Sequence, residues 1–345
     1  MKSTVYFVPA NSINDGIGKV LKLSGFLDLL PYRRKLGVKV HFGEEGNDNY
    51  LSPKIVNVVI KTLSQRGVQP ALFETTTLYR GKRAEAKSHT ELARSHGFRL
   101  NEVLAPIEII DGKRGENYFV QETNLPLIKN AKIGRGLRKV SLLLNLAHFK
   151  GHFVTGFGGA IKNIAMGLAA KGGKLDMHSL SKPYVNADKC KSCGDCLDVC
   201  PADAISFVRY VAKIGIGCYG CASCVSACPQ GAIQVKWNEA SDMTQRKIAE
   251  YAKVILDNRK TLHFNFLLKL TPNCDCYPQT EKPFMPDIGF FAAYDPVAIE
   301  QAAYDKVKDK LKEIYPHLNP EIILEHGEKI GLGSRDYQIV EVEWR

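Results

Sequence analysis

The chain has 345 residues, a formal net charge of +11 at pH 7 and 45% hydrophobic residues, an ordinary soluble composition that can bury one large core or two moderate ones. No apolar run approaches the roughly 18 residues that a membrane-spanning helix needs, which excludes a membrane protein. Lys and Arg are scattered and no nucleic-acid motif accompanies them, which argues against nucleic acid as a partner and leaves an acidic redox partner protein or a small-molecule substrate.

The N-terminal half alternates predicted strands and helices. Residues 36–42 (LGVKVHF) alternate as a strand does, and Ser52-Pro53 predicts the start of a helix that ends near Gly67. A strand over 69–77 and a helix over 82–97 follow. Further strands are predicted over 106–112, 117–122 and 139–149. This alternation is typical of an α/β domain with a largely parallel sheet and helices on both faces.

A glycine-rich stretch follows the last of these strands. Ligands of open α/β sheets bind at the carboxyl ends of the strands, so we expect a ligand site here. The helix after the glycines would direct its N-terminus and a lysine toward an anion such as a phosphate or a carboxylate. The candidate site residues are His152, Lys162 and His178 as catalytic groups, with Gly156, Gly158, Gly159 and Lys162 as cofactor-binding groups.

Eight of the ten cysteines then form two copies of one pattern, C-x2-C-x2-C-x3-C-P. This is the spacing of bacterial two-cluster ferredoxins, in which the fourth cysteine of each copy ligates the other 4Fe-4S cluster. The first predicted ligand set is Cys190, Cys193, Cys196 and Cys228, and the second is Cys218, Cys221, Cys224 and Cys200. The sequence therefore predicts two 4Fe-4S clusters.

Two other uses of these cysteines have to be weighed. A structural zinc ion takes four ligands and gives no reason for a third evenly spaced cysteine followed by C-P in both copies. Disulfides need an oxidising compartment, whereas the start MKSTVYFVPA has neither a basic segment nor a long apolar core of a signal peptide. We therefore expect a cytoplasmic, reducing location.

The α/β pattern resumes after the cysteines. A helix is predicted over 244–258, strands over 262–270 and 287–293, and a further helix after Asp295-Pro296. The predicted domains are 1–183 and 238–345, as two parts of one α/β domain, and 184–237 as an inserted α+β ferredoxin-like unit. Two independent α/β domains joined by a ferredoxin linker are the alternative.

Five segments together resemble a family of uncharacterised iron-sulfur centre proteins, a domain of unknown function with a ferredoxin insert. They are GVKVHFGE, TLYRGKR, HFKGH with GFGGAIKN, NCDC and DIGFFAAYDPVAIEQA. This resemblance covers nearly the whole chain. It implies the fold and the two clusters, but it implies no reaction.

A second resemblance is to the lactate racemase catalytic domain. It is based on His152, Gly156, Phe157, Gly158, Gly159, Lys162 and His178. It implies that His152 is an acid/base, that Lys162 tethers a nickel-pincer nucleotide and that His178 ligates nickel. His41 and His89 are both candidates for the second catalytic histidine of the racemases, which lack a ferredoxin insert.

Cys274 and Cys276 form a C-x-C pair after a predicted strand. They are either reduced thiols in a tight turn or ligands of a third metal or cofactor centre together with His152 or His178. The leading hypothesis is an iron-sulfur electron-transfer protein or oxidoreductase that passes single electrons to or from a His/Lys/Cys-lined pocket. A nickel-pincer-type isomerase or racemase, with an additional metal or nucleotide-type cofactor, is the alternative, and a non-catalytic electron carrier is a third possibility.

Overall fold

The computed structural model of the protein describes residues 2–30, 35–178, 182–200, 202–218, 220–235 and 241–342. Its centre is an eight-stranded sheet in the order β16-β1-β15-β14-β7-β2-β3-β4. In chain order these strands are β1 (Ser3–Pro9), β2 (Lys35–Val40), β3 (Gln69–Glu74), β4 (Ile107–Ile109), β7 (Leu142–His148), β14 (Lys260–Leu267), β15 (Gly289–Ala293) and β16 (Tyr337–Glu341). Only β15 runs antiparallel to its two neighbours, so the sheet is largely parallel, as predicted.

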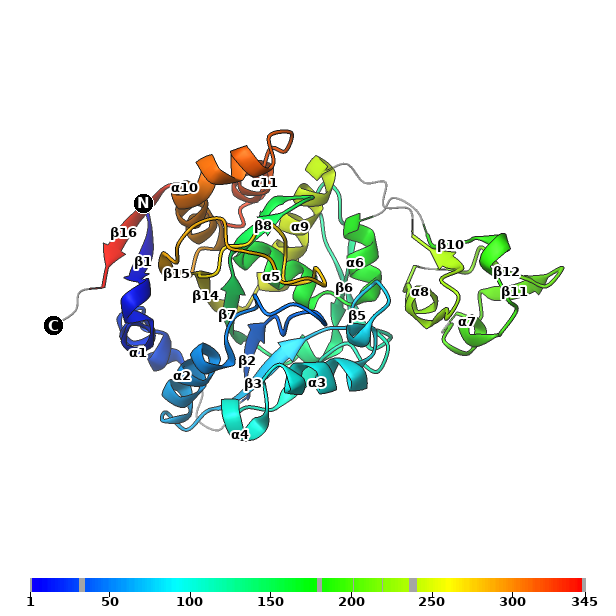
Figure 1. Ribbon diagram of the computed structural model, residues 1–345, viewed down its shortest axis with the longest axis horizontal. Coiled ribbons are helices and arrows are strands. Elements are labelled where there is room, and N and C mark those ends of the chain that lie inside the picture. The colour runs from blue at the N-terminus through cyan, green and yellow to red at the C-terminus, as the bar shows by residue number, and fades with distance from the viewer. Residues whose placement is uncertain are drawn as a thin grey trace.

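Helices cover both faces of the sheet (Figure 1). One face packs against α1 (Ile13–Leu23), α2 (Pro53–Ser64) and α4 (Leu100–Val103). The other packs against α5 (Ala160–Leu168), α9 (Ser241–Leu256), α10 (Pro296–Ile314) and α11 (Ile322–Lys329). Two more helices, α3 (Ala86–Ser95) and α6 (Lys171–His178), follow β3 and α5 in the chain. The predicted α/β class with helices on both faces is confirmed.

The central strand β7 shows why the sequence folds this way. Leu144 and Leu146 pack into the core on one face, whereas Leu143 and Ala147 pack into the core on the other. All seven residues of β7 are buried. A parallel strand that is covered on both faces has a nearly continuous apolar sequence, which explains the run SLLLNLAHF.

Two predicted helix starts have the expected capping geometry. The Ser52 side chain accepts a hydrogen bond from the Lys54 N–H, and Pro53 is the first residue of α2. Asp295 accepts hydrogen bonds from the N–H groups of Val297 and Ala298 at 2.9 and 3.0 Å at the start of α10. A side-chain oxygen at this position satisfies N–H groups that have no partner within the helix.

Some predicted strands lie outside the sheet. The segment over 117–122 becomes β5 (Tyr118–Glu122), which pairs only with β6 (Asn130–Gly134) in a separate antiparallel ribbon. A second small ribbon consists of β8 (Lys150–His152) and β9 (Gly156–Gly158). The strand predicted over 262–270 ends earlier, as β14.

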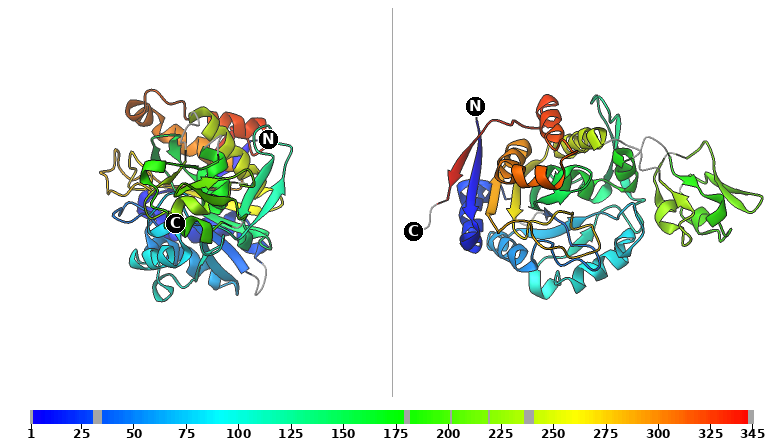
Figure 2. Two further views of the ribbon diagram at one scale, coloured as in Figure 1. Left: turned by 90° about the vertical axis from the view of Figure 1, so that its right-hand side faces the viewer. Right: turned by 45° about the horizontal axis from the view of Figure 1, so that its top comes forward.

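Residues 184–235, here called the cysteine-rich unit, lie to one side of the body formed by the sheet and its helices (Figures 1 and 2). The unit contains β10 (Tyr184–Val185) paired with β13 (Ile233–Gln234), β11 (Ile205–Val208) paired with β12 (Val211–Ile214), α7 (Asp195–Asp198) and α8 (Ser223–Ala227). Pro201 and the predicted boundary at 237 lie outside the described residues. The central sheet takes strands from the segments before and after the unit.

Within the described ranges, none of the helices combines the length and the apolar character that a bilayer crossing requires.

Candidate functional site

A cavity of about 770 Å³ opens where the parallel strands β2, β3, β7 and β14 end. The segments that follow these four strands supply most of its wall. This is where open α/β sheets bind their ligands. The predicted residues that line it are His41, His152, Gly158, Gly159, Lys162, His178, Cys274 and Cys276, whereas His89 does not line it. Gly156 is not among the lining residues; its backbone has φ +75° and packs against Pro320.

The glycine-rich stretch positions Lys162. Gly159 is the N-cap of α5, and a Cβ atom at this position would lie 2.7 Å from Oε1 of Glu300, so only glycine fits here. Lys162 is in the first turn of α5. Its ammonium group lies 3.7 Å from Sγ of Cys274 and within hydrogen-bonding distance of this sulfur. The helix and the C-x-C turn therefore meet across the cavity.

The C-x-C pair occupies a tight turn in which the Tyr277 N–H donates to the Cys274 carbonyl at 2.8 Å. Asp275 between the two cysteines is fully buried. It accepts hydrogen bonds from Nδ1 of His148 at 2.7 Å and from Nζ of Lys150 at 3.1 Å. Burial alone would raise the pKa of Asp275, but His148 and Lys150 hold it well below its ordinary value.

The two thiols of this turn are in contact. Sγ of Cys276 lies 2.8 Å from Sγ of Cys274, and the Cys276 N–H also points at that sulfur, at 3.4 Å. The hydrogen bond from Cys276, followed by the charges of Lys162 and Lys150, holds the pKa of Cys274 well below its ordinary value. Cys274 is therefore the thiol of the pair that ionises first.

His152 lies beside this pair. One ring nitrogen of His152 and the sulfurs of Cys274 and Cys276 all lie within 4.8 Å of one another, a group that could hold a metal ion. Nδ1 of His152 accepts hydrogen bonds from the N–H groups of Val154 and Thr155, both at 3.2 Å. Burial, with Lys162 and His178 next in importance, places the pKa of His152 well below its ordinary value, so the ring is neutral at pH 7.

His178 reaches the cavity from α6. Burial, and after it the charge of Lys162, lowers the pKa of His178 to about 4. Lys174, one turn earlier on α6, also lines the cavity and donates to the Ala169 carbonyl at 2.7 Å. Burial lowers the pKa of Lys174 to about 8. The three predicted groups His152, Lys162 and His178 thus lie in one cavity.

Sequence reasoning missed a buried ion network under the cavity. Nζ of Lys39 lies 3.0 Å from Oε1 of Glu74, and Nη2 of Arg83 lies 3.6 Å from the same oxygen. The network also reaches Glu44 and Tyr79, because Arg83 lies 3.6 Å from Glu44 and donates to the Tyr79 hydroxyl at 3.1 Å. The available signal was a charged residue inside each of two apolar strands, Lys39 in LGVKVHF and Glu74 in QPALFE. Strand alternation predicts that such residues face solvent, but helices cover both faces here.

Buried histidines make stability depend on pH. Burial places the pKa values of His41, His89 and His152 well below 6.5 and that of His263 at about 3. In the unfolded chain these rings bind protons as the pH falls through about 6.5, while the folded rings do not, so unfolding takes up protons. We expect the urea midpoint of unfolding to fall steadily from pH 7 toward pH 5. A His263→Asn variant should show a shallower decline, and a midpoint independent of pH would contradict this account.

The cysteine-rich unit brings its eight cysteines together in two groups. The pKa of Cys196 is raised by burial and by the neighbouring side chains of Cys193, Cys228 and Cys190. The neighbours of Cys224 are chiefly Cys221, Cys218 and Cys200, and burial together with these side chains raises the pKa of Cys224 to about 12. In each group the fourth cysteine comes from the other copy of the motif. A small cavity is lined by Cys190, Cys193, Cys196 and Cys228.

Backbone N–H groups point at several of these sulfurs. The N–H groups of Ala204, Ala212 and Ala232 lie 3.3, 3.4 and 3.2 Å from Sγ of Cys200, Cys190 and Cys228, respectively. Such hydrogen bonds stabilise thiolates and tune the potential of any cluster bound to them.

The unit contacts the body at α6. Leu175 of α6 and Leu78, from the loop after β3, belong to the hydrophobic cluster of the cysteine-rich unit. Lys171 of α6 donates a hydrogen bond to the Ser226 hydroxyl. A Cβ atom on Gly172 would lie 2.9 Å from the Gly220 carbonyl oxygen and 3.3 Å from Cα of Cys221. The backbone of the second cysteine group therefore packs directly on the helix that supplies Lys174 and His178 to the cavity.

Comparisons with known proteins give a family and two similar folds. A family model described as "Domain of unknown function (DUF362)" matches residues 36–305. A Thermotoga maritima protein solved by the Northeast Structural Genomics Consortium is similar over 88% of this chain and 59% of its own, with 13% identity and a TM-score of 0.43. The lactate racemase apoprotein from Thermoanaerobacterium thermosaccharolyticum is similar over 78% of this chain and 51% of its own, with 14% identity and a TM-score of 0.42.

The chain thus spans between half and three fifths of the length of these two structures. None of the curated proteins compared with the chain matches it.

Proposed function

This chain belongs to the DUF362 family, whose description assigns no function, and we propose that it is an iron-sulfur protein that exchanges single electrons between an external partner and the cavity. Two 4Fe-4S clusters, one held by Cys190, Cys193, Cys196 and Cys228 and the other by Cys218, Cys221, Cys224 and Cys200, would supply one-electron transfer. The cavity would bind the substrate or the cofactor.

The arrangement of the sulfurs supports clusters over single zinc ions. Four thiolates on one zinc ion lie about 3.8 Å apart, because each Zn–S bond is about 2.3 Å long and the geometry is tetrahedral. Among the described residues, no three of the eight sulfurs approach one another within 4.8 Å. A cube of iron and sulfide is larger than one ion and keeps its cysteine sulfurs farther apart. The exchange of the fourth cysteine between the two groups also matches a two-cluster ferredoxin.

The proposal depends on one observation: α6 contacts the cysteine-rich unit and also lines the cavity. Gly172 on this helix contacts the backbone of Gly220 and Cys221, while Lys174 and His178 on the same helix line the cavity. The second cysteine group is thereby next to the cavity wall. A pure electron carrier needs only exposed clusters and a docking face, so a large cavity beside them favours an oxidoreductase.

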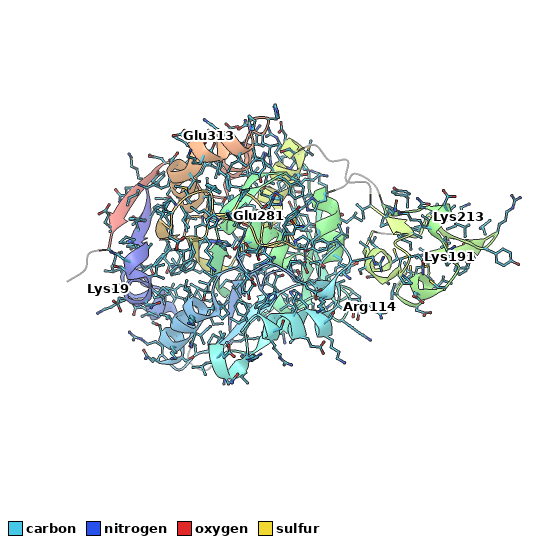
Figure 3. The ribbon with its side chains drawn as sticks, viewed as in Figure 1. Lys19, Arg114, Lys191, Lys213, Glu281 and Glu313 are labelled. Carbon is cyan, nitrogen blue, oxygen red and sulfur yellow. The ribbon has the colours of Figure 1, made fainter. Side chains whose placement is uncertain are left out.

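The outer side of the cysteine-rich unit suits a protein partner. Val208 and Tyr210, at the turn of the β11–β12 hairpin, are exposed there, with relative exposures of 50% and 86%. Lys191 and Lys213 lie on the same unit (Figure 3). An apolar patch flanked by lysines is suited to an acidic redox protein, because opposite charges speed the encounter and apolar groups stabilise the contact.

Metal analysis tests the proposal. Anaerobically purified protein is expected to contain about eight irons and eight sulfides per chain. Reduction with dithionite should bleach its visible absorption and produce cluster signals in electron paramagnetic resonance. Two zinc ions per chain, or no bound metal, would contradict the proposal.

A nickel-pincer-type isomerase or racemase is the second candidate. One observation favours it: the three residues that the racemase pattern assigns to acid/base, tether and metal-ligand roles, His152, Lys162 and His178, all line the same cavity. Intact-mass spectrometry separates the two candidates. A covalent adduct that is lost in a Lys162→Ala variant, together with about one nickel per chain, would support the isomerase. An unmodified chain without nickel would support the oxidoreductase.

A further inference from the structure

We propose that Cys274 and Cys276 are a redox-active dithiol–disulfide pair in the cavity, with Cys274 as the attacking thiolate and Cys276 as the resolving thiol. The substrate class is a small disulfide that bears carboxylate groups. This inference deepens the proposed function and rests on it only for the source of electrons.

The first support is the position of the two sulfurs. Sγ of Cys274 and Sγ of Cys276 lie 2.8 Å apart, and both residues line the cavity. A disulfide requires two sulfurs that already face each other, because large backbone movements would otherwise strain the bond. Here the bond needs only a small further approach of two side chains.

The second support is that hydrogen bonds fix the turn at the residue before Cys274 and at the residue between the two cysteines. The buried side chain of Asp275 is bonded to His148 and Lys150. Asn273, which precedes Cys274, donates two hydrogen bonds of 2.8 Å to the Glu281 carboxylate, one from its backbone N–H and one from its side-chain amide. Figure 3 labels Glu281 within the body of the molecule. Because the residues before and between the cysteines are fixed, the sulfurs remain adjacent in either redox state.

The third support is the charge around Cys274. The Lys162 ammonium lies 3.7 Å from Sγ of Cys274, and Lys150 is bonded to the adjacent Asp275. Positive groups next to a thiol favour the thiolate, which is the form that attacks disulfides. The same charges would attract the carboxylates of a substrate, and Arg80 and Lys174 also line the cavity.

The groups around Cys274 and Cys276 favour a redox-active dithiol over a metal site formed by the two cysteines and His152. Nδ1 of His152 accepts two backbone N–H groups, so the proton of the neutral ring is on Nε2. A metal ion at Nε2 would have to displace that proton, and at Nδ1 it would break both hydrogen bonds. Lys162 and Lys150 would in addition repel a cation.

The chemistry balances as thiol–disulfide exchange. The Cys274 thiolate attacks one sulfur of the substrate disulfide, whose S–S bond breaks and releases one thiolate. The Cys276 thiol loses its proton to that thiolate and attacks Cys274, which forms the Cys274–Cys276 bond and releases the second thiolate. Two electrons have then passed to the substrate. Two electrons, one from each of the proposed clusters, and one proton then restore the Cys274 thiolate and the Cys276 thiol.

Alkylation mass spectrometry tests the pair on the full-length protein under anaerobic conditions. The tryptic peptide that begins at Leu270 contains Cys274 and Cys276 and no other cysteine. After incubation with glutathione disulfide, we expect this peptide to lose both alkylation sites and two mass units. After reduction with dithiothreitol, both sites should return. Full alkylation after glutathione disulfide, or protection of both thiols by one bound metal ion per chain, would overturn the proposal.

Cysteine and lysine variants test which thiol attacks the substrate and which one resolves the mixed disulfide. Cys276→Ser should trap glutathione as a mixed disulfide on Cys274, whereas Cys274→Ser should trap little on Cys276. Lys162→Gln should slow the trapping by about tenfold, because the nearby ammonium stabilises the attacking thiolate. Trapping that is faster on Cys276, or unchanged in Lys162→Gln, would refute the assignment. With uncharged 2-hydroxyethyl disulfide, trapping on Cys276→Ser should be slower; equal rates would refute a carboxylate-bearing substrate.

The two proposals can fail separately. The thiol readout concerns one peptide that contains none of the eight predicted cluster ligands, while the iron content concerns only those eight. About eight irons with an inert pair would refute the dithiol and leave the clusters in place. An active pair without iron would refute the clusters.

Discussion

Replacing Cys200 and Cys218 together by alanine is expected to leave about four of eight irons per chain after a chelator wash of the anaerobic protein. The two residues are 18 positions apart and belong to different copies of the motif, but both are neighbours of Cys224. If they ligate the same cluster, the double variant removes half of the ligands of that cluster. The other cluster keeps all four thiolates, so its iron resists the chelator.

The matched control is the double variant Cys200→Ala with Cys190→Ala. These two residues belong to the same copy of the motif but to different predicted ligand sets. Each cluster then lacks one thiolate, and the chelator should remove nearly all of the iron. The reverse result, with iron retained in the control and lost in the first variant, would mean that each copy of the motif holds its own cluster.

The second large effect is expected in the buried ion network. In a Glu74→Gln variant, Lys39 and Arg83 lose the carboxylate that lies 3.0 and 3.6 Å from them, and all three side chains are at most 5% exposed. Breaking a buried pair by removing one partner costs about 3–5 kcal/mol, because the remaining charge is desolvated without compensation. Burial already lowers the pKa of Lys39 to about 8, so the lysine can release its proton and bring the cost toward the lower end.

Urea denaturation measures this loss as a decrease in the midpoint of unfolding. Glu313→Gln is the matched control, because Glu313 pairs with Lys310 at 2.8 Å on the exposed side of α10 (Figure 3). Exposed pairs contribute about 0–1 kcal/mol, so the control should unfold close to the unmodified protein. Equal midpoints for the two variants would show that the Glu74 network does not stabilise the fold.

Local sequence signals predicted the positions of helices and strands better than they predicted which strands pair. The Ser52-Pro53 and Asp295-Pro296 pairs predict helix starts because capping depends on residues that are adjacent in sequence. The strand pattern of 117–122 gives no information on pairing, and the segment forms a ribbon with β6 away from the central sheet. The first and last strands, β1 and β16, were missed because both have weaker alternation; β16 is an edge strand of the sheet and β1 is its neighbour.

The candidate site was likewise predicted only in part. A general rule about the carboxyl ends of parallel strands placed His152 and Lys162 at a cavity. The expected His/Lys/Cys-lined pocket also brought Cys274 and Cys276 to this site, but the sequence did not indicate that the Lys162 ammonium would lie 3.7 Å from Sγ of Cys274. The burial of Lys39 and Glu74 was not predicted, because period-two alternation does not reveal when both faces of a strand are covered.

The pairing of β16 with β1 has a practical consequence. Both strands lie at the edge of the sheet opposite the cysteine-rich unit (Figure 1). A linker fused to either terminus would therefore anchor the molecule to an electrode with its sulfur-rich end directed into the electrolyte. In that orientation, voltammetry should report current only when a dissolved mediator connects the surface to the protein.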